Sequence, residues 1–167
     1  MHPIDETVIR ASFVNASKRE RASLNLPEHL PDLDWDAVDF LGWIDRKLPQ
    51  QAYVVVEIDG EPVGALLRRA DGRTRTRPQC SWCEDVHLPN DVVFYTAKRS
   101  GDAGRRGDTI GTLVCAAFEC SRNVRKLPTL AYTGFDREAA RQRRIEALRE
   151  HVTAFVRDVR DGGTSRA

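Results

Sequence analysis

All four cysteines of this 167-residue chain fall into two close pairs. Cys80 and Cys83 are spaced C-x2-C, Cys115 and Cys120 are spaced C-x4-C, and 31 residues separate the two pairs. Zn²⁺ is bound tetrahedrally by four thiolates, and two cysteines a few residues apart can reach one ion from a single turn. The spacing therefore predicts one structural zinc ion that joins two distant segments of the chain.

Disulfide bonds are the first alternative, since an even number of cysteines also suits a secreted protein. The N-terminus lacks the basic and apolar regions of a signal peptide, and no apolar run is long enough to span a membrane. We therefore expect a cytoplasmic protein, in which paired cysteines more often bind metal. A redox role for Cys80 and Cys83 would leave Cys115 and Cys120 without a function. Disulfide or redox use stays open beside zinc.

Two other cysteine chemistries fit the spacing poorly. The pairs lack the cysteine runs of ferredoxins, which argues against an iron–sulfur cluster. Gln79 separates Pro78 from Cys80, and no His-x-Glu motif precedes them, which argues against a zinc deaminase. A closed four-thiolate site also leaves no position for an activated water. Since no motif unites the four histidines either, we expect a protein that is not an enzyme.

The charge of the chain is uneven along its length. Residues 1–65 carry a net charge of −6 (6 basic, 12 acidic), residues 66–130 carry +5 (12 and 7), and residues 131–167 carry +2 (8 and 6). The basic excess coincides with the cysteine segment, where an acidic protein surface or a phosphate backbone could bind. A solvated basic face without a partner is the other interpretation.

The first of three predicted segments, residues 1–50, contains short helices and a wrapping stretch. An acidic first turn and an apolar face predict a helix over residues 5–14, and the capping box Ser17-Lys18-Arg19-Glu20 predicts a second short helix. Prolines interrupt residues 26–49, which we expect to be irregular and to wrap the core with large apolar side chains.

The second segment, residues 51–161, is predicted to be the zinc-finger domain, and residues 162–167 a disordered tail. Asp59-Gly60 between two β-rich runs predicts a hairpin over 52–69. Two more strands are expected at 92–98 and 109–114, joined by a glycine-rich loop, and a helix is expected to follow from Cys115.

A long helix is expected from Asp136 to about Arg160, packed on the sheet rather than in a dimer seam. Its apolar face is formed by Ile145, Leu148, Val152, Phe155 and Val159. The prediction is thus an α+β protein, a treble-clef-like zinc finger with antiparallel β-hairpins packed against a long C-terminal helix. We expect it to be a monomer.

Several linked motifs give the chain a resemblance. They are Leu24-Asn25-Leu26-Pro27, Asp39-Phe40-Leu41-Gly42-Trp43, Cys80-x-x-Cys83, and Gly104-Arg105-x-Gly107-x3-Gly111-Thr112-x2-Cys115-x4-Cys120-Ser121. Together they resemble the FBP family, the treble-clef zinc-finger proteins related to elongation factor G-binding, FusB-type fusidic acid resistance proteins. The likeness extends over roughly residues 5–160. It implies a four-cysteine zinc site and docking on elongation factor G, which the resistance proteins help to release from the ribosome.

The resistance proteins also carry a separate N-terminal helical-bundle domain, whereas only two short helices are predicted here before the finger. The resemblance is therefore to the zinc-finger domain, and it implies factor binding more directly than drug protection.

The leading hypothesis is a non-enzymatic module whose zinc-ordered basic surface binds elongation factor G or the ribosome. From their positions, the candidate partner-binding residues are Trp82, Arg105, Arg106, Arg122, Arg125 and Lys126. The alternative is a zinc finger that binds nucleic acid such as ribosomal RNA, with Arg73, Arg75 and Arg77 added to the phosphate contacts.

Overall fold

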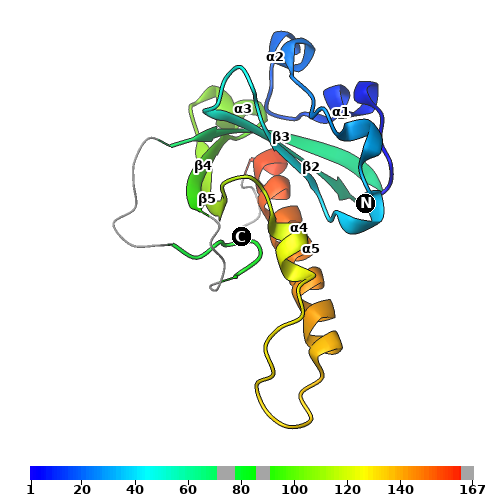
Figure 1. The fold of residues 1–167 in the computed structure, drawn as a ribbon. Coiled ribbons are helices and arrows are strands. Elements are labelled where there is room, and N and C mark those ends of the chain that lie inside the picture. Colours follow the sequence, from blue (N-terminus) through cyan, green and yellow to red (C-terminus); the bar gives the residue numbers. More distant parts are fainter. Residues whose placement is uncertain (71–77, 86–90, 163–167) are drawn as a thin grey trace.

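The computed structural model describes residues 1–70, 78–85 and 91–162. A five-stranded antiparallel sheet in the order β1-β2-β3-β4-β5 separates two layers (Figure 1). The N-terminal segment covers one face, and the long helix α5 covers the other. The elements are α1 (Glu6–Ser12), α2 (Lys18–Ser23), η1 (Leu30–Asp32), η2 (Trp35–Ala37), β1 (Leu41–Ile44), β2 (Gln51–Ile58), β3 (Glu61–Arg69), β4 (Val92–Lys98), α3 (Gly101–Arg105), β5 (Thr109–Cys115), α4 (Cys120–Val124) and α5 (Arg137–Asp161).

Both predicted N-terminal helices are present, and side-chain caps define their starts. Asp5 accepts a hydrogen bond from the Val8 amide at the start of α1. Ser17 and Glu20 form the reciprocal capping box of α2. These caps satisfy amide groups that have no partner within a helix, which explains why such short helices form.

The stretch predicted to be irregular contains the edge strand β1, so that part of the prediction is wrong. Within β1, Leu41 and Trp43 are buried, and the strand pairs antiparallel with β2. Four residues are too few for an alternating pattern to stand out, and the pairing partner supplies the hydrogen bonds. The predicted segment boundary at residue 50 thus falls between two paired strands of one sheet.

The predicted hairpins are confirmed. Asp59 (φ 54°) and Gly60 (φ 84°) turn the chain between β2 and β3, and β4 pairs with β5 along the whole of both strands. The loop expected between β4 and β5 contains the short helix α3 instead. The Ser100 amide donates to the Val159 carbonyl of α5, and the Ser100 hydroxyl donates to that of Arg160. Contact with the end of α5 therefore orders a glycine-rich segment.

The long helix begins and ends as its sequence predicts. The Asp136 side chain caps its first turn, and Gly162 ends it in the left-handed conformation at φ 67°. The five residues of the predicted apolar face are buried, together with Val156. They pack on the sheet in a core that also includes the four cysteines. Within the described residues, no helix is both long and apolar enough to cross a membrane.

Residues 163–167 of the predicted tail lie outside the described residues, as do Arg73, Arg75 and Arg77 of the arginine-rich segment.

Candidate metal centre

The four cysteine sulfurs converge on one point inside the protein. All four Sγ atoms lie within 4.8 Å of one another. The Cys80–Cys120 and Cys83–Cys115 Sγ distances are both 3.7 Å. A tetrahedral Zn²⁺ with Zn–S bonds of about 2.3 Å requires S···S distances of about 3.8 Å, so the donor set fits this ion. The same distances are far too long for disulfide bonds, which are about 2.05 Å.

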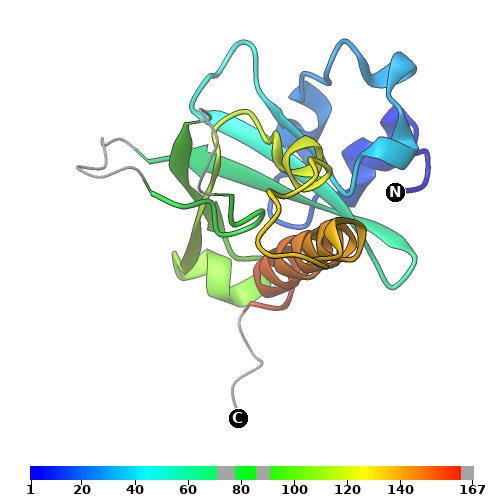
Figure 2. The ribbon, with the colours of Figure 1, turned by 60° about the horizontal axis from the view of Figure 1, so that its bottom comes forward.

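Three different structural elements supply the ligands. Cys80 and Cys83 flank a tight turn, here called the knuckle (residues 80–83), which is fixed by the Glu84 amide donating to the Cys80 carbonyl and by the Ser81 amide donating to Leu113 of β5. The other pair comes from the β4–β5 hairpin and the helix that follows it (Figure 2).

The predicted helix starts later than expected. Cys115 is the last residue of β5, and α4 begins only at Cys120. Between them Phe118 adopts a left-handed conformation, at φ 57°. A turn therefore carries the chain from strand to helix, and both sulfurs still reach the same point.

Two N–H groups are directed at the sulfurs of two of the ligands. The Cys83 amide lies 3.5 Å from Cys80 Sγ, and Asn123 Nδ2 lies 3.6 Å from Cys115 Sγ. Asn123 is fully buried, and its Oδ1 has no hydrogen-bond partner among the described residues. Sequence reasoning missed Asn123; its only signal is its position on the helix that carries Cys120. Such outer-shell donors orient metal ligands and tune them.

Electrostatics shows why this cluster needs a cation. Hydrogen bonds within the cluster, above all with Cys115, lower the pKa of Cys80 but raise the pKa of Cys120. Four buried thiols this close cannot all ionise against one another's negative charge. A dication at their centre allows all four to bind as thiolates.

An aromatic cluster surrounds the metal centre, and it contains Trp82. The Trp82 side chain is 2% exposed, and its ring packs near those of Phe40, Phe118 and Phe155 at centroid distances of 5.3 to 6.3 Å. The prediction that Trp82 lies on the surface is therefore wrong. Burying the large indole ring in the core is favourable enough to turn this side chain inward, although its backbone lies in an exposed turn.

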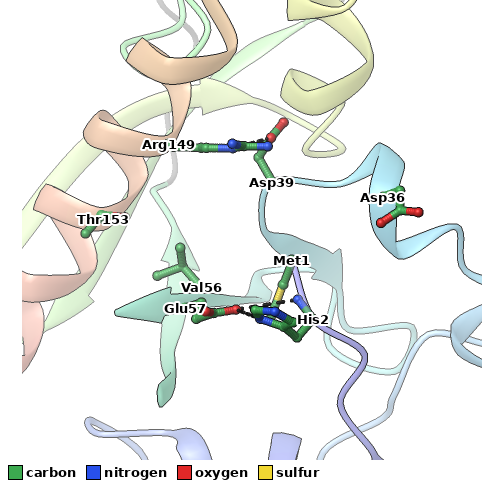
Figure 3. Close-up of a pocket in the computed structure, with 8 residues that line it drawn as sticks. All are labelled: Met1, His2, Asp36, Asp39, Val56, Glu57, Arg149 and Thr153. Carbon is green, nitrogen blue, oxygen red and sulfur yellow. Dashed lines mark hydrogen bonds and ion pairs between the residues drawn. The ribbon is translucent and has the colours of Figure 1, made fainter. Parts of the chain in front are cut away.

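Arg125 is also less available than predicted, because it belongs to a buried ion-pair cluster. Asp39, whose side chain is fully buried, accepts hydrogen bonds from Arg125, which directly follows α4, and from Arg149 of α5. The Asp39 amide donates to the hydroxyl of Ser121. Figure 3 shows Asp39 and Arg149 meeting at one side of a pocket that is also lined by the N-terminal residues Met1 and His2. Asp39 thus ties the N-terminal segment to the zinc-bearing helix.

The other predicted partner-binding residues lie on the surface. Arg105 forms an exposed ion pair with Asp102, and Arg106 forms one with Asp108. Arg122 and Lys126 are exposed on and just after α4. These four side chains do not form one compact site with the cysteines.

The strongest exposed apolar feature was not predicted. It is the segment between α4 and α5, residues 126–136, here called the arm, which projects away from the sheet in Figure 1. Leu127, Leu130 and Tyr132 are 44%, 66% and 65% exposed. The Tyr132 ring packs 5.3 Å from that of Phe135. Irregular spacing hides these residues from a search for helical or strand periodicity.

A knuckle, a β-hairpin and a helix that bring four thiolates to one point define a treble-clef zinc finger, and the site binds one structural zinc ion. The chain belongs to the family described as FBP C-terminal treble-clef zinc-finger, whose model matches residues 8–159. No curated protein matches the chain. Among solved structures, the fusidic acid resistance protein FusC is similar, with 19% identity and a TM-score of 0.48 over 63% of this chain. The match covers 47% of FusC, so this chain corresponds to about half of that protein's length.

Proposed function

We propose that this protein is a non-enzymatic docking module that binds elongation factor G in the cytoplasm and promotes its release from the ribosome. Membership of the FBP zinc-finger family supports the choice of partner. The four thiolates complete the coordination of the ion, which supports a structural rather than a catalytic role for the zinc.

The observation that carries the proposal is the arm. Large apolar side chains that are more than half exposed and lie close together are unusual on a protein surface and mark interaction sites. Leu130 and Tyr132 are 66% and 65% exposed and stand two residues apart in the arm. Residues 122–144, which include the arm, contain seven basic and two acidic residues, for a net charge of +5. Arg125 and Arg144 pair with Asp39 and Asp85 outside this range, which leaves an excess of three positive charges. An apolar centre with a basic surround fits an acidic protein surface.

Gel filtration of the zinc-loaded protein with purified elongation factor G, before and after nuclease treatment, tests the docking. We expect a complex of defined stoichiometry that resists nuclease. A complex that nuclease abolishes would support the nucleic-acid alternative, and failure to form any complex would refute the proposal.

A matched pair of surface variants tests the role of the arm. Replacing Leu130 and Tyr132 with alanine should weaken binding at least tenfold, since truncating a central apolar contact often costs more than 1 kcal/mol. Leu48 is 53% exposed but lies in the β1–β2 connection, so Leu48→Ala should leave the affinity unchanged. Sedimentation of ribosomes with bound factor should then show release by the wild type and by Leu48→Ala, and not by the arm variant.

A further inference from the structure

A groove of about 420 Å³ opens beside the zinc centre, between the knuckle, the arm and α5. Trp82 and Cys83 line one side of it, Phe135 lines the arm side, and Arg143 and Arg144 lie along α5. Of the four zinc ligands, Cys83 is the one that lines this groove. The groove therefore brings solvent to one particular ligand residue.

The other three ligands are better protected. Cys80 and Cys120 are completely buried, and Cys115 is 2% exposed against 5% for Cys83. Cys80 and Cys115 also have N–H groups directed at their sulfurs, from the Cys83 amide and the Asn123 side chain. A donated hydrogen bond withdraws electron density from a thiolate and makes it a weaker nucleophile. Within residues 1–70, 78–85 and 91–162, burial protects Cys120 and both factors protect Cys80 and Cys115, so Cys83 is the most accessible of the four ligands.

Positive charge beside the groove should favour anionic reagents over neutral ones. Arg144 is held in place, with Nη2 2.8 Å from Asp85 Oδ2 and Nη1 3.3 Å from the Lys126 carbonyl. Arg143 is exposed and forms no ion pair with any of the described residues. Its guanidinium group raises the local concentration of anions at the groove.

We propose that Cys83 is the modification site of the zinc centre, attacked first by small thiol-directed electrophiles and by peroxides. Both classes react with the thiolate form of cysteine, which is the form that binds zinc. At about 420 Å³, the groove has room for molecules of this size. The inference is independent of the docking partner.

With hydrogen peroxide the steps balance as follows. The Cys83 thiolate attacks one peroxide oxygen, the O–O bond breaks, and the departing hydroxide takes a proton from solvent to become water. The sulfur loses two electrons and becomes a sulfenic acid. The Cys115 thiolate, 3.7 Å away, then displaces hydroxide from that sulfur. A Cys83–Cys115 disulfide and a second water result, and the site loses two of its four zinc ligands.

Limited alkylation of the zinc-loaded full-length chain tests the order of reaction. Iodoacetamide is added below one equivalent, the labelled cysteine is located by fragmentation mass spectrometry, and zinc release is followed with a chromogenic chelator. We expect the first label on Cys83, with zinc released as it is modified. First labelling of any other cysteine would overturn the proposal, and so would equal labelling of all four, which would indicate reaction through global unfolding.

Two arginine variants test whether positive charge at the groove attracts anionic reagents. At Cys83, the rate of reaction with anionic iodoacetate divided by the rate with neutral iodoacetamide should fall about two- to threefold in Arg143→Ala. A change of this size is expected when one charge is removed several ångströms away in a largely aqueous groove. Arg157 lies on the same helix, is 46% exposed and pairs with Asp59 outside the groove. Arg157→Ala should leave the ratio unchanged. Equal ratios in all three proteins would refute the role of Arg143.

Peroxide provides the last test. Treatment with hydrogen peroxide should give a Cys83–Cys115 disulfide as the first cross-link, together with zinc release. A first cross-link between Cys80 and Cys120, whose sulfurs are also 3.7 Å apart, would contradict attack at Cys83.

Discussion

Replacing Asp39 with alanine should destabilise the protein more than replacing either of its arginine partners. The Asp39 side chain is fully buried, whereas those of Arg125 and Arg149 are 26% and 52% exposed. Arg149 Nε lies 2.8 Å from Asp39 Oδ1, and Arg125 Nη2 lies 3.2 Å from the same oxygen. One carboxylate therefore compensates two cations from two helices.

The expected size follows from these exposures. Removing one partner from a buried ion pair costs about 3–5 kcal/mol. Water can reach both arginines, so the cost of Asp39→Ala should fall to about 2–3 kcal/mol. Arg149 is half exposed, and Arg149→Ala should cost about 0.5–1 kcal/mol. Arg125→Ala should lie between the two.

Urea unfolding of the zinc-loaded variants, at one fixed concentration of free zinc, measures these differences through the transition midpoints. Arg157→Ala removes an arginine from an exposed pair with an N···O distance of 3.7 Å, and should change the free energy of unfolding by less than about 0.5 kcal/mol. If Asp39→Ala changed stability no more than Arg157→Ala, or if Arg149→Ala cost as much as Asp39→Ala, the inferred role of the buried carboxylate would be wrong.

Three further predictions concern the metal, the sheet and pH. Cys115→Ser, or removal of zinc by a strong chelator, should unfold the C-terminal half, since zinc contributes about 10 kcal/mol or more in small fingers; retention of the native circular dichroism and melting temperature would contradict a structural zinc. Gly42→Ala should cost about 1–3 kcal/mol, because the added Cβ would lie 2.7 Å from the Phe118 ring; an unchanged melting temperature would show that the ring moves freely. Burial acts to raise the pKa of Asp45, but hydrogen bonds from Tyr53 and nearby groups outweigh it and lower that pKa below 3.8. Asp45 therefore stabilises the fold above the unfolded-state pKa and loses this effect as pH falls through the folded-state value, so Tyr53→Phe should shift acid unfolding to higher pH.

Local signals explain which elements the sequence could predict. The capping box of α2, the Asp59-Gly60 turn and the apolar face of α5 each lie within a few residues of the structure they specify. The cysteine spacing is equally local within each pair. These features predicted the sheet hairpins, the long helix and the zinc ligands.

Several of the errors depend on contacts distant in sequence. Strand β1 exists through its pairing with β2, and α3 is ordered by carbonyl groups at the end of α5. Trp82 lies between two metal ligands in a turn, where exposure is the natural expectation, yet the rings of Phe40 and Phe155, from distant parts of the chain, pack against it. A single sequence does not show which distant segments will meet.

The arm should depend on zinc although it contains no zinc ligand. One end of it follows α4, which begins at Cys120 and packs against α5. Its backbone is then held to α5, since Arg144 donates to the Lys126 carbonyl and Arg137 donates to that of Pro128. Zinc fixes α4 relative to β5, and α4 and α5 together fix the two ends of the arm. In the proposed docking, loss of the ion should therefore abolish binding through a surface that the ion does not touch.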